Sequence, residues 1–497
     1  MDLPLQFEEI TCFEMMGSMT AAHEETLETA IPEYCPDIAR IVDTVGQLCI
    51  REKLPGKDRY TVSGTVKVTV LYTSEGVPGL RSLRLSVPFS CQWEDPRPGQ
   101  CQMVGLTGRV LLAEAKAITS RKLYLRVLPE VTITPYCQVR RRLCTDTGAE
   151  QSLRIKRQEW EVNCLCDVAQ KQFTFTQDLQ LPEGEQAEDL LLVQMCPRVN
   201  SLQRIGNKFS LKGEMTVRAL YRDENQTLRV HESVVPMAEI LEGTDLAEDA
   251  TYTVNCMVTE YDGRLLRTDV GSGVGITAGI VAEISAYCRK NISCVEDVYS
   301  LCHCTELQCE SVGLPEDYPP RQVSQEAGER LEFPQADPFV FVSQWDLSPV
   351  AVLQEENGAL LRTALHLKIL YVDETGAPLS TERTVEISAS TGQAMGNVTA
   401  SCCGMSVHCS GNTCQLQGQV VFSVSCARSR TVQVLTAVNL TEEQGDCRNP
   451  SLVLRRMQSG ETLWDIAKQY QTDADAIVAA NPEGIDAGRL LLIPKIR

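Results

Sequence analysis

Three copies of one nine-residue pattern recur along the chain and constrain its fold more than any other feature. The copies are GTVKVTVLY (64–72), GEMTVRALY (213–221) and TALHLKILY (363–371), and their Leu-Tyr pairs are 149 and then 150 residues apart. Apolar and polar residues alternate in each copy, which is typical of a half-buried antiparallel strand. We therefore expect the same strand three times, with Lys67, Arg218 and Lys368 on its polar face.

The surroundings of the pattern repeat as well. A polar turn follows each copy, with the sequences TSEG, RDEN and DETG, and a second extended segment comes next. Further downstream we expect hairpins around 105–133, 251–290 and 397–440. Solenoid units are roughly 20–50 residues long, so a period near 150 residues indicates complete domains instead.

We therefore predict a mainly β chain of three tandem domains and a small α+β tail. The domains are expected at 1–150, 151–310 and 311–447, with the tail at 451–497. A linker is expected to lead the third domain, because the stretch 314–336 (LPEDYPPRQVSQEAGERLEFPQA) is rich in proline and charge.

Charge and hydropathy exclude several classes of partner. The chain has 66 acidic and 46 basic residues among its 497, a formal net charge of −20, and this field repels phosphate backbones and anionic lipid. No stretch approaches the roughly 20 apolar residues of a membrane helix. The N-terminal residues lack the basic start and apolar core of an export signal. We expect no nucleic acid, no membrane insertion and a cytoplasmic location.

Twenty-two cysteines are unusual for such a chain. In a reducing compartment we expect thiols, mostly as small buried apolar groups, and not structural disulfides. Two alternatives stay open, namely metal binding and oxidative cross-linking at a later stage. No CxxC motif occurs, so the usual zinc signatures are absent. We expect neither metal nor cofactor, and the weak metal candidates are Cys294, Cys302, His303, Cys304 and Cys309.

The tail has a different periodicity from the rest of the chain. Its pattern predicts strand, helix, helix and strand in fewer than fifty residues. The segments SGETLWDIAKQY (459–470), Asn481 and LLLIP (490–494) closely resemble a LysM module.

The LysM resemblance implies a shallow groove that binds polymers of N-acetylglucosamine. Its groove residues correspond here to Gly460, Glu461, Thr462, Leu463, Ile485, Asp486 and Ala487. The expected core of the module comprises Trp464, Ile466, Tyr470 and Ile493.

The repeats also resemble a known domain. The sequence IPEYCPDI (31–38), the strand at 64–72, VPF (87–89) and ITSRKLYLRV (118–127) are similar to the SPOCS domain of endospore-forming Firmicutes. Tandem SPOCS domains followed by LysM are typical of the SipL-like family of spore-coat morphogenesis proteins. The resemblance implies a non-catalytic scaffold in the mother-cell cytoplasm. Such a scaffold binds the morphogenetic ATPase of the coat basement and attaches the coat to the forespore.

Two other functions compete with the scaffold. The first is an adaptor that binds peptidoglycan or N-acetylglucosamine oligomers through the LysM module. The second is a cell-wall hydrolase, because LysM modules often accompany one. The chain has five histidines and no HExxH motif, and we find no Cys-His pattern that predicts a nucleophile. We therefore do not expect an enzyme.

Overall fold

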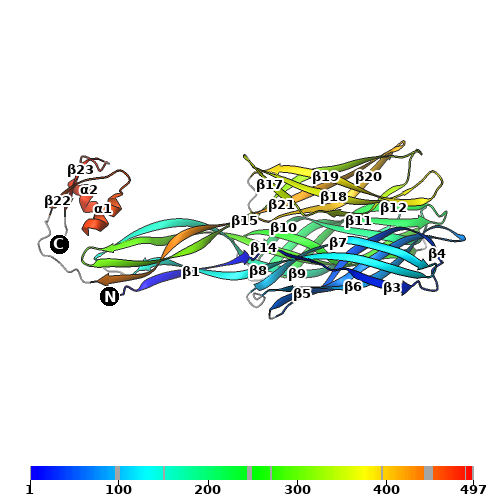
Figure 1. Cartoon of the computed structure of the whole chain (residues 1–497), viewed down its shortest axis with the longest axis horizontal. Coiled ribbons are helices and arrows are strands. Elements are labelled where there is room, and N and C mark those ends of the chain that lie inside the picture. Colours follow the sequence, from blue (N-terminus) through cyan, green and yellow to red (C-terminus); the bar gives the residue numbers. More distant parts are fainter. Residues whose placement is uncertain are drawn as a thin grey trace.

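The computed structural model describes residues 2–56, 58–95, 101–148, 151–242, 249–268, 271–356, 358–392, 396–441, 452–486 and 488–494. Nearly all of this chain is β strand, and the two helices of these residues both lie in the tail. The predicted fold class is confirmed. The repeats form an elongated body with a narrower extension, and the tail lies at the end of that extension (Figure 1).

The three repeats use strands in a similar order. The first contains β1 (Leu5–Met15), β2 (Met19–Ala22), β3 (Glu25–Ala30), β4 (Ile38–Pro55), β5 (Arg59–Ser74), β6 (Val77–Glu94), β7 (Cys101–Thr119) and β8 (Lys122–Thr147). The second contains β9 (Leu153–Gln180), β10 (Ala187–Ile205), β11 (Lys208–Asp223), β12 (Leu228–Glu242), β13 (Thr251–Thr268) and β14 (Gly271–Ser300). The third contains β15 (Cys304–Glu332), β16 (Val340–Leu347), β17 (Ala351–Glu355), β18 (Gly358–Val372), β19 (Pro378–Thr391), β20 (Val398–Ser410) and β21 (Thr413–Thr441).

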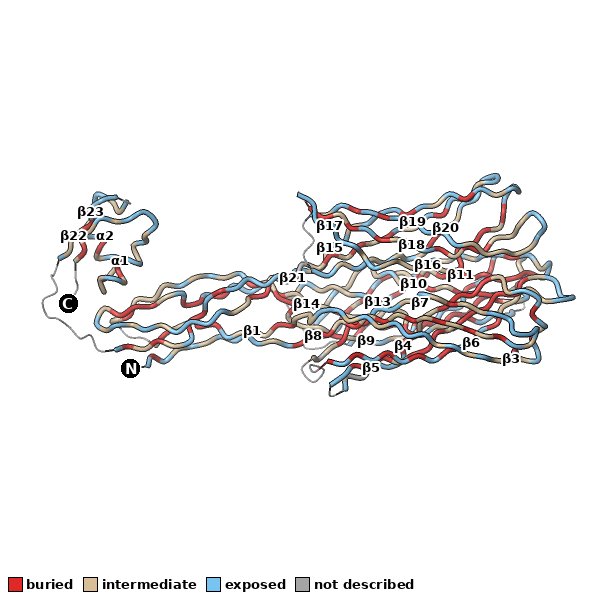
Figure 2. Tube along the Cα trace, in the orientation of Figure 1, coloured by how far each residue is buried: buried red, intermediate tan, exposed pale blue. Residues whose placement is uncertain are grey.

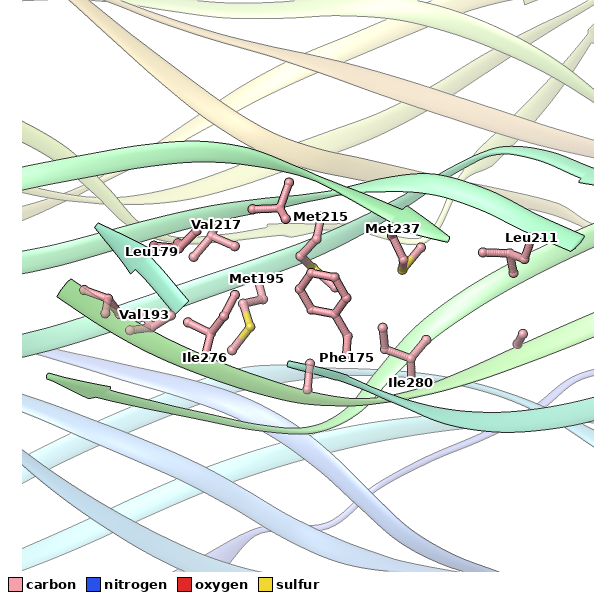
Figure 3. Close-up of a cluster of buried hydrophobic side chains, with 14 of the residues drawn as sticks. Phe175, Leu179, Val193, Met195, Leu211, Met215, Val217, Met237, Ile276 and Ile280 are labelled. Carbon is pink, nitrogen blue, oxygen red and sulfur yellow. The ribbon is translucent and has the colours of Figure 1, made fainter. Parts of the chain in front are cut away.

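Each copy of the nine-residue pattern lies in the central strand of an antiparallel sheet. Strand β5 pairs with β4 and β6, β11 pairs with β10 and β12, and β18 pairs with β16, β17 and β19. In each repeat a second sheet packs on this one. The hairpin β7–β8 belongs to a five-stranded sheet, and the hairpins β13–β14 and β20–β21 belong to one six-stranded sheet. The alternating apolar side chains are buried between the two sheets, as Met215 and Val217 show in the second repeat (Figure 3). The predicted strands are confirmed.

The opposite face of each central strand is not a solvated surface, and here the simple polar-face expectation is wrong. The Lys67 ammonium of the first repeat donates to the Tyr261 carbonyl of the second. The Arg218 guanidinium is 3% exposed and lies 4.8 Å from the centre of the Phe341 ring in the third repeat. The Lys368 ammonium donates to the Thr44 carbonyl of the first repeat, at 3.0 Å. The repeats therefore close into a ring in which each contacts the next.

A shared apolar cluster fills the centre of this ring. The leucine of each Leu-Tyr pair contributes to it, and Leu71, Leu220 and Leu370 are all 0% exposed. The tyrosines point instead into the cores of their own repeats, where Tyr72 and Tyr221 are buried. Successive residues of a strand face opposite sides, so each Leu-Tyr pair joins a repeat's own core to the common one.

The narrower extension, which we call the stalk, consists of the outer parts of six strands. These are β1, β8, β9, β14, β15 and β21, and a continuous buried cluster runs between them (Figure 2). The expected linker is wrong, because Leu314 to Glu332 belong to β15. The pairing of β15 with β21 shifts between Tyr318 and Arg321. Pro319 and Pro320 fall in that irregularity, where a missing N–H does not interrupt the ladder.

The described cysteines comprise buried thiols, exposed thiols and disulfides. Buried thiols occur throughout the cores, and burial raises the pKa of Cys12 to about 12 and that of Cys294 to about 11. Six cysteines are instead joined as disulfides, namely Cys101–Cys137, Cys166–Cys288 and Cys409–Cys414. The expectation of thiols is wrong for these six, because antiparallel strand pairing places the members of each pair on neighbouring strands, at sequence separations of 36, 122 and 5 residues.

Candidate functional site in the C-terminal tail

The tail folds as a small unit of two strands and two helices. Strands β22 (Leu452–Arg456) and β23 (Leu490–Pro494) pair antiparallel, and α1 (Leu463–Tyr470) and α2 (Ala474–Ala480) lie between them in sequence. Helix α1 begins with a capping box, in which Thr462 and Asp465 bond to each other's backbone N–H groups. The core contains Ile466 and Ile493, each 1% exposed.

The described groove residues lie in the loop before α1, at Leu463 where α1 begins, and in the loop before β23, and hydrogen bonds connect these two regions. The Met457 N–H donates to the Arg489 carbonyl at 3.0 Å, and the Gly488 N–H donates to the Met457 carbonyl at 2.8 Å. Leu463, the first residue of α1, and Ile485, in the loop before β23, are half-buried, and both pack on the tail core. The remaining groove predictions are placed as follows: Gly460, Thr462 and Asp486 are exposed, Glu461 is half-buried, and Ala487 lies outside the described residues.

The acidic groups beside these loops already have partners within the tail. The Glu461 carboxylate pairs with the Arg455 guanidinium at 2.5 Å and accepts from the Gln458 N–H at 2.9 Å. Hydrogen bonds from the Thr462 hydroxyl and N–H lower the pKa of Asp465. Asp486 lies 3.6 Å from the Arg489 guanidinium and is largely exposed. The loops therefore present a surface whose charges are mostly paired, which suits a neutral ligand.

A comparison with protein families bears directly on this unit. The LysM domain model matches residues 457–494. Residues 457–494 are a LysM domain. A LysM domain indicates binding of peptidoglycan or a related carbohydrate. No curated protein matches the chain.

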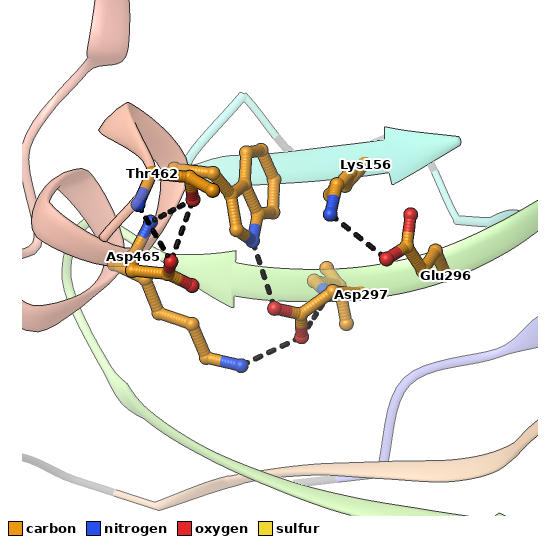
Figure 4. Close-up of polar contacts among 8 residues, drawn as sticks. Lys156, Glu296, Asp297, Thr462 and Asp465 are labelled. Atoms are coloured by element: carbon orange, nitrogen blue, oxygen red, sulfur yellow. Dashed lines mark hydrogen bonds and ion pairs between the residues drawn. The ribbon is translucent and has the colours of Figure 1, made fainter. Parts of the chain in front are cut away.

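The LysM domain docks on the stalk tip through the carboxylate of Asp297 in β14. The Trp464 indole N–H donates to Asp297 Oδ2 at 2.8 Å, and the Lys468 ammonium donates to Oδ1 at 2.6 Å (Figure 4). The Trp464 ring also packs edge-on against Tyr299, with ring centres 4.8 Å apart. Tyr299 is 2% exposed and belongs to the same cluster as the LysM core.

Contacts of the segment between the two helices complete this interface. The Arg154 guanidinium pairs with Asp473 at 2.5 Å, the Tyr299 hydroxyl donates to the Thr472 carbonyl at 2.8 Å, and Gln471 donates to the His303 carbonyl at 3.1 Å. We call the set of these contacts and the Asp297 contacts the stalk interface. It is absent from our sequence expectations, in which Trp464 is only a core residue. The one signal for it was the helical spacing that places Trp464, Lys468 and Gln471 on one face.

The stalk interface leaves the groove uncovered. In the described part of the LysM domain, every hydrogen bond and ion pair to the stalk comes from Trp464, Lys468 or residues 471–473. The groove residues 460–463 and 485–486 make none of them. Tyr470 is half-buried, on the tail core.

The weak metal candidates do not form one site. Cys294 is buried in the stalk core, whereas Cys302, Cys304 and Cys309 are exposed. His303 lies beside two of these cysteines in sequence, in a bend at the stalk tip. Within the described ranges, no three His, Cys, Asp or Glu side chains are arranged to hold a metal ion.

Two further findings concern the expectations of no enzyme and no membrane insertion. The ring nitrogens of His366 contact the hydroxyls of Ser348 and Thr384, at 2.9 and 3.1 Å, and not a carboxylate. In a Ser-His-Asp triad, a carboxylate would stand where the Thr384 hydroxyl contacts Nδ1 of His366. Neither of the two helices in the described chain is long enough to cross a membrane.

Proposed function

We propose that the chain is a non-catalytic adaptor that holds a LysM domain on a β stalk and presents its groove to N-acetylglucosamine-containing glycan. The observation that carries this proposal is the stalk interface, which fixes one face of the domain and leaves the groove uncovered. A surface with paired charges suits an uncharged sugar polymer, which binds through apolar faces and backbone hydrogen bonds.

A sedimentation assay on insoluble peptidoglycan tests glycan binding. The full-length chain is expected to sediment with the polymer, and chitin oligomers are expected to release it. Ile485→Ala removes an apolar contact at the groove edge, so retention should fall. Asp475→Ala is the control, because Asp475 is exposed in the first turn of α2 and lies outside the groove. Equal retention of both variants would contradict the groove assignment, and no retention of the unmodified chain would contradict glycan binding.

A second function rests on the resemblance of the repeats to SPOCS domains. We propose that the same adaptor works in spore-coat assembly, in the mother-cell cytoplasm at the forespore surface, with the coat-basement ATPase as its protein partner. The combination of three such repeats with a LysM domain supports this setting. In it, the groove edge contacts a protein, and Asp486→Lys should weaken that contact without unfolding the domain.

Co-precipitation of the ATPase distinguishes the protein partner from glycan. The full-length chain should bind it, and a chain without residues 451–497 should not. A melt of the truncated chain controls for loss of the β fold. If the truncated chain binds fully, the repeats carry the interaction and the LysM domain has another role.

A further inference from the structure

The three repeats together form a pocket at the end of the body opposite the LysM domain. The pocket has a volume of about 520 Å³, which is within the usual range for ligand sites. Strand β9 begins at the stalk tip and ends at Gln180, and the turns that follow β5, β11 and β18 lie at this far end. Residues of all three turns, or beside them, line the pocket: Ser74 and Val77, Gln226 and Thr227, and Asp373 and Gly376. We call it the axial pocket because it lies at one end of the shared central cluster.

One part of the wall of the axial pocket is apolar and joins that cluster. Leu80 and Leu228 line the pocket and belong to the cluster, with exposures of 1% and 9%. Phe339 packs on the same cluster from the third repeat. A ligand here would contact each repeat, so the site exists only when the ring is closed.

The charged groups of the axial pocket are carboxylates, and neutral side chains such as Ser74 and Gln226 lie beside them. The Gln335 Oε1 atom is buried and has no hydrogen-bond partner, while its amide nitrogen donates to the Val372 carbonyl at 2.5 Å. Such a buried orphan acceptor is costly, and a ligand in the pocket can donate to it only after the Gln335 side chain rotates toward the opening. Asp337 and Asp373 are the charged residues of the lining, and no Lys or Arg is among the lining residues. Hydrogen bonds from its own turn lower the pKa of Asp373, so this carboxylate is ionised at neutral pH.

We propose that the axial pocket binds a short peptide segment of a partner protein that inserts a Lys or Arg side chain. The basic group donates to Gln335 and faces Asp337, and apolar residues beside it contact Leu80, Leu228 and Phe339. The net charge of −20 on the chain attracts such a basic segment from a distance. This site is separate from the proposed glycan groove, and its test does not depend on LysM binding.

Selection from a random twelve-residue peptide library on the full-length chain provides the probe. Enriched peptides are expected to contain Lys or Arg next to an apolar residue. Asp337→Asn should weaken their binding about fivefold, as loss of an exposed charge pair does, and added salt should weaken it further. Asn suits this position, because Asp337 has a φ of 50°. Gln335→Met should weaken binding about tenfold, since it removes the buried acceptor.

The matched control is Glu374→Gln, which removes one charge from an exposed residue next to Asp373, in the turn after β18, that is outside the lining. It should bind the peptides like the unmodified chain. Melts of all variants confirm that they are folded. Three results would overturn the proposal: enrichment without basic residues, equal binding by Asp337→Asn and Glu374→Gln, or equally tight binding of free arginine amide, which would indicate a small-molecule site.

Discussion

Removing the Asp297 carboxylate is expected to release the LysM domain from the stalk. In Asp297→Ala, the Trp464 indole and the Lys468 ammonium both lose their acceptor. A hydrogen bond to a charged group contributes roughly 1.5–3 kcal/mol, and a partly exposed ion pair adds about 0.2–1 kcal/mol. The total of about 2–4 kcal/mol corresponds to a docked-to-free ratio that is lower by about 30- to 700-fold, at 1.4 kcal/mol per factor of ten.

Fluorine NMR of the chain labelled with 5-fluorotryptophan measures this release. The chain has four tryptophans, and Trp464→Phe identifies the signal of Trp464. In the unmodified chain this signal should have the width of a large rigid particle and a shift set by the Tyr299 ring. In Asp297→Ala it should approach the signal of the isolated LysM domain.

Glu296→Ala is the matched control. Glu296 precedes Asp297 in the same strand, but its carboxylate pairs with Lys156 at 2.8 Å and contacts no LysM residue. The Trp464 signal should therefore not change. If Asp297→Ala also leaves it unchanged, Asp297 does not hold the domain, and the reasoning on the stalk interface is refuted.

Three further predictions concern the repeats. Burial raises the pKa of Asp317 to about 6, so the folded chain binds this proton more tightly than the unfolded chain does. The free energy of unfolding therefore falls as pH rises from about 4 to 6. In urea melts, Asp317→Asn should be about 1–2 kcal/mol more stable than the unmodified chain at pH 7, after discounting for solvent, and equally stable at pH 4. The hydrogen bond from Cys196 lowers the pKa of Cys403. Near neutral pH, iodoacetamide should therefore modify Cys403 faster than the exposed Cys309. Mass spectrometry measures both rates, and equal rates would disprove this prediction. Residues 1–150 alone should keep a sheet-type circular dichroism spectrum but expose Leu71 of the central cluster and bind a hydrophobic dye, whereas a monomer that binds none would show that the repeat is self-sufficient.

The sequence was sufficient for features set by local periodicity. Alternation in Met215–Ala219 and its counterparts predicted the three strands and their buried faces, and the helical spacing around Ile466 predicted the tail. The role of Arg218 could not be predicted in this way, because a basic residue opposite an apolar face has the same pattern whether it meets water or a neighbouring repeat. The segment 314–332 was misread because proline at a break in strand pairing resembles proline in a linker.

The same limit applies to the candidate site. The groove residues could be proposed because the LysM pattern is compact and local. The partner of Trp464 lies 167 residues away at Asp297, and no spacing within the tail indicates it. Likewise, the axial pocket requires three turns about 150 residues apart to meet, which only ring closure achieves.

The ring of three repeats fixes how many copies a chain of this type can contain. Each repeat uses one side to contact its successor, and the third returns to the first, so a fourth copy has no free side to join. A chain with two copies would leave the leucines that correspond to Leu71 exposed, until another chain supplied the missing third repeat. A protein with a single copy should therefore assemble as a homotrimer, in the way that closed cyclic symmetry completes other rings. Gene duplication and fusion would convert such a trimer into one chain, whose repeats could then diverge separately.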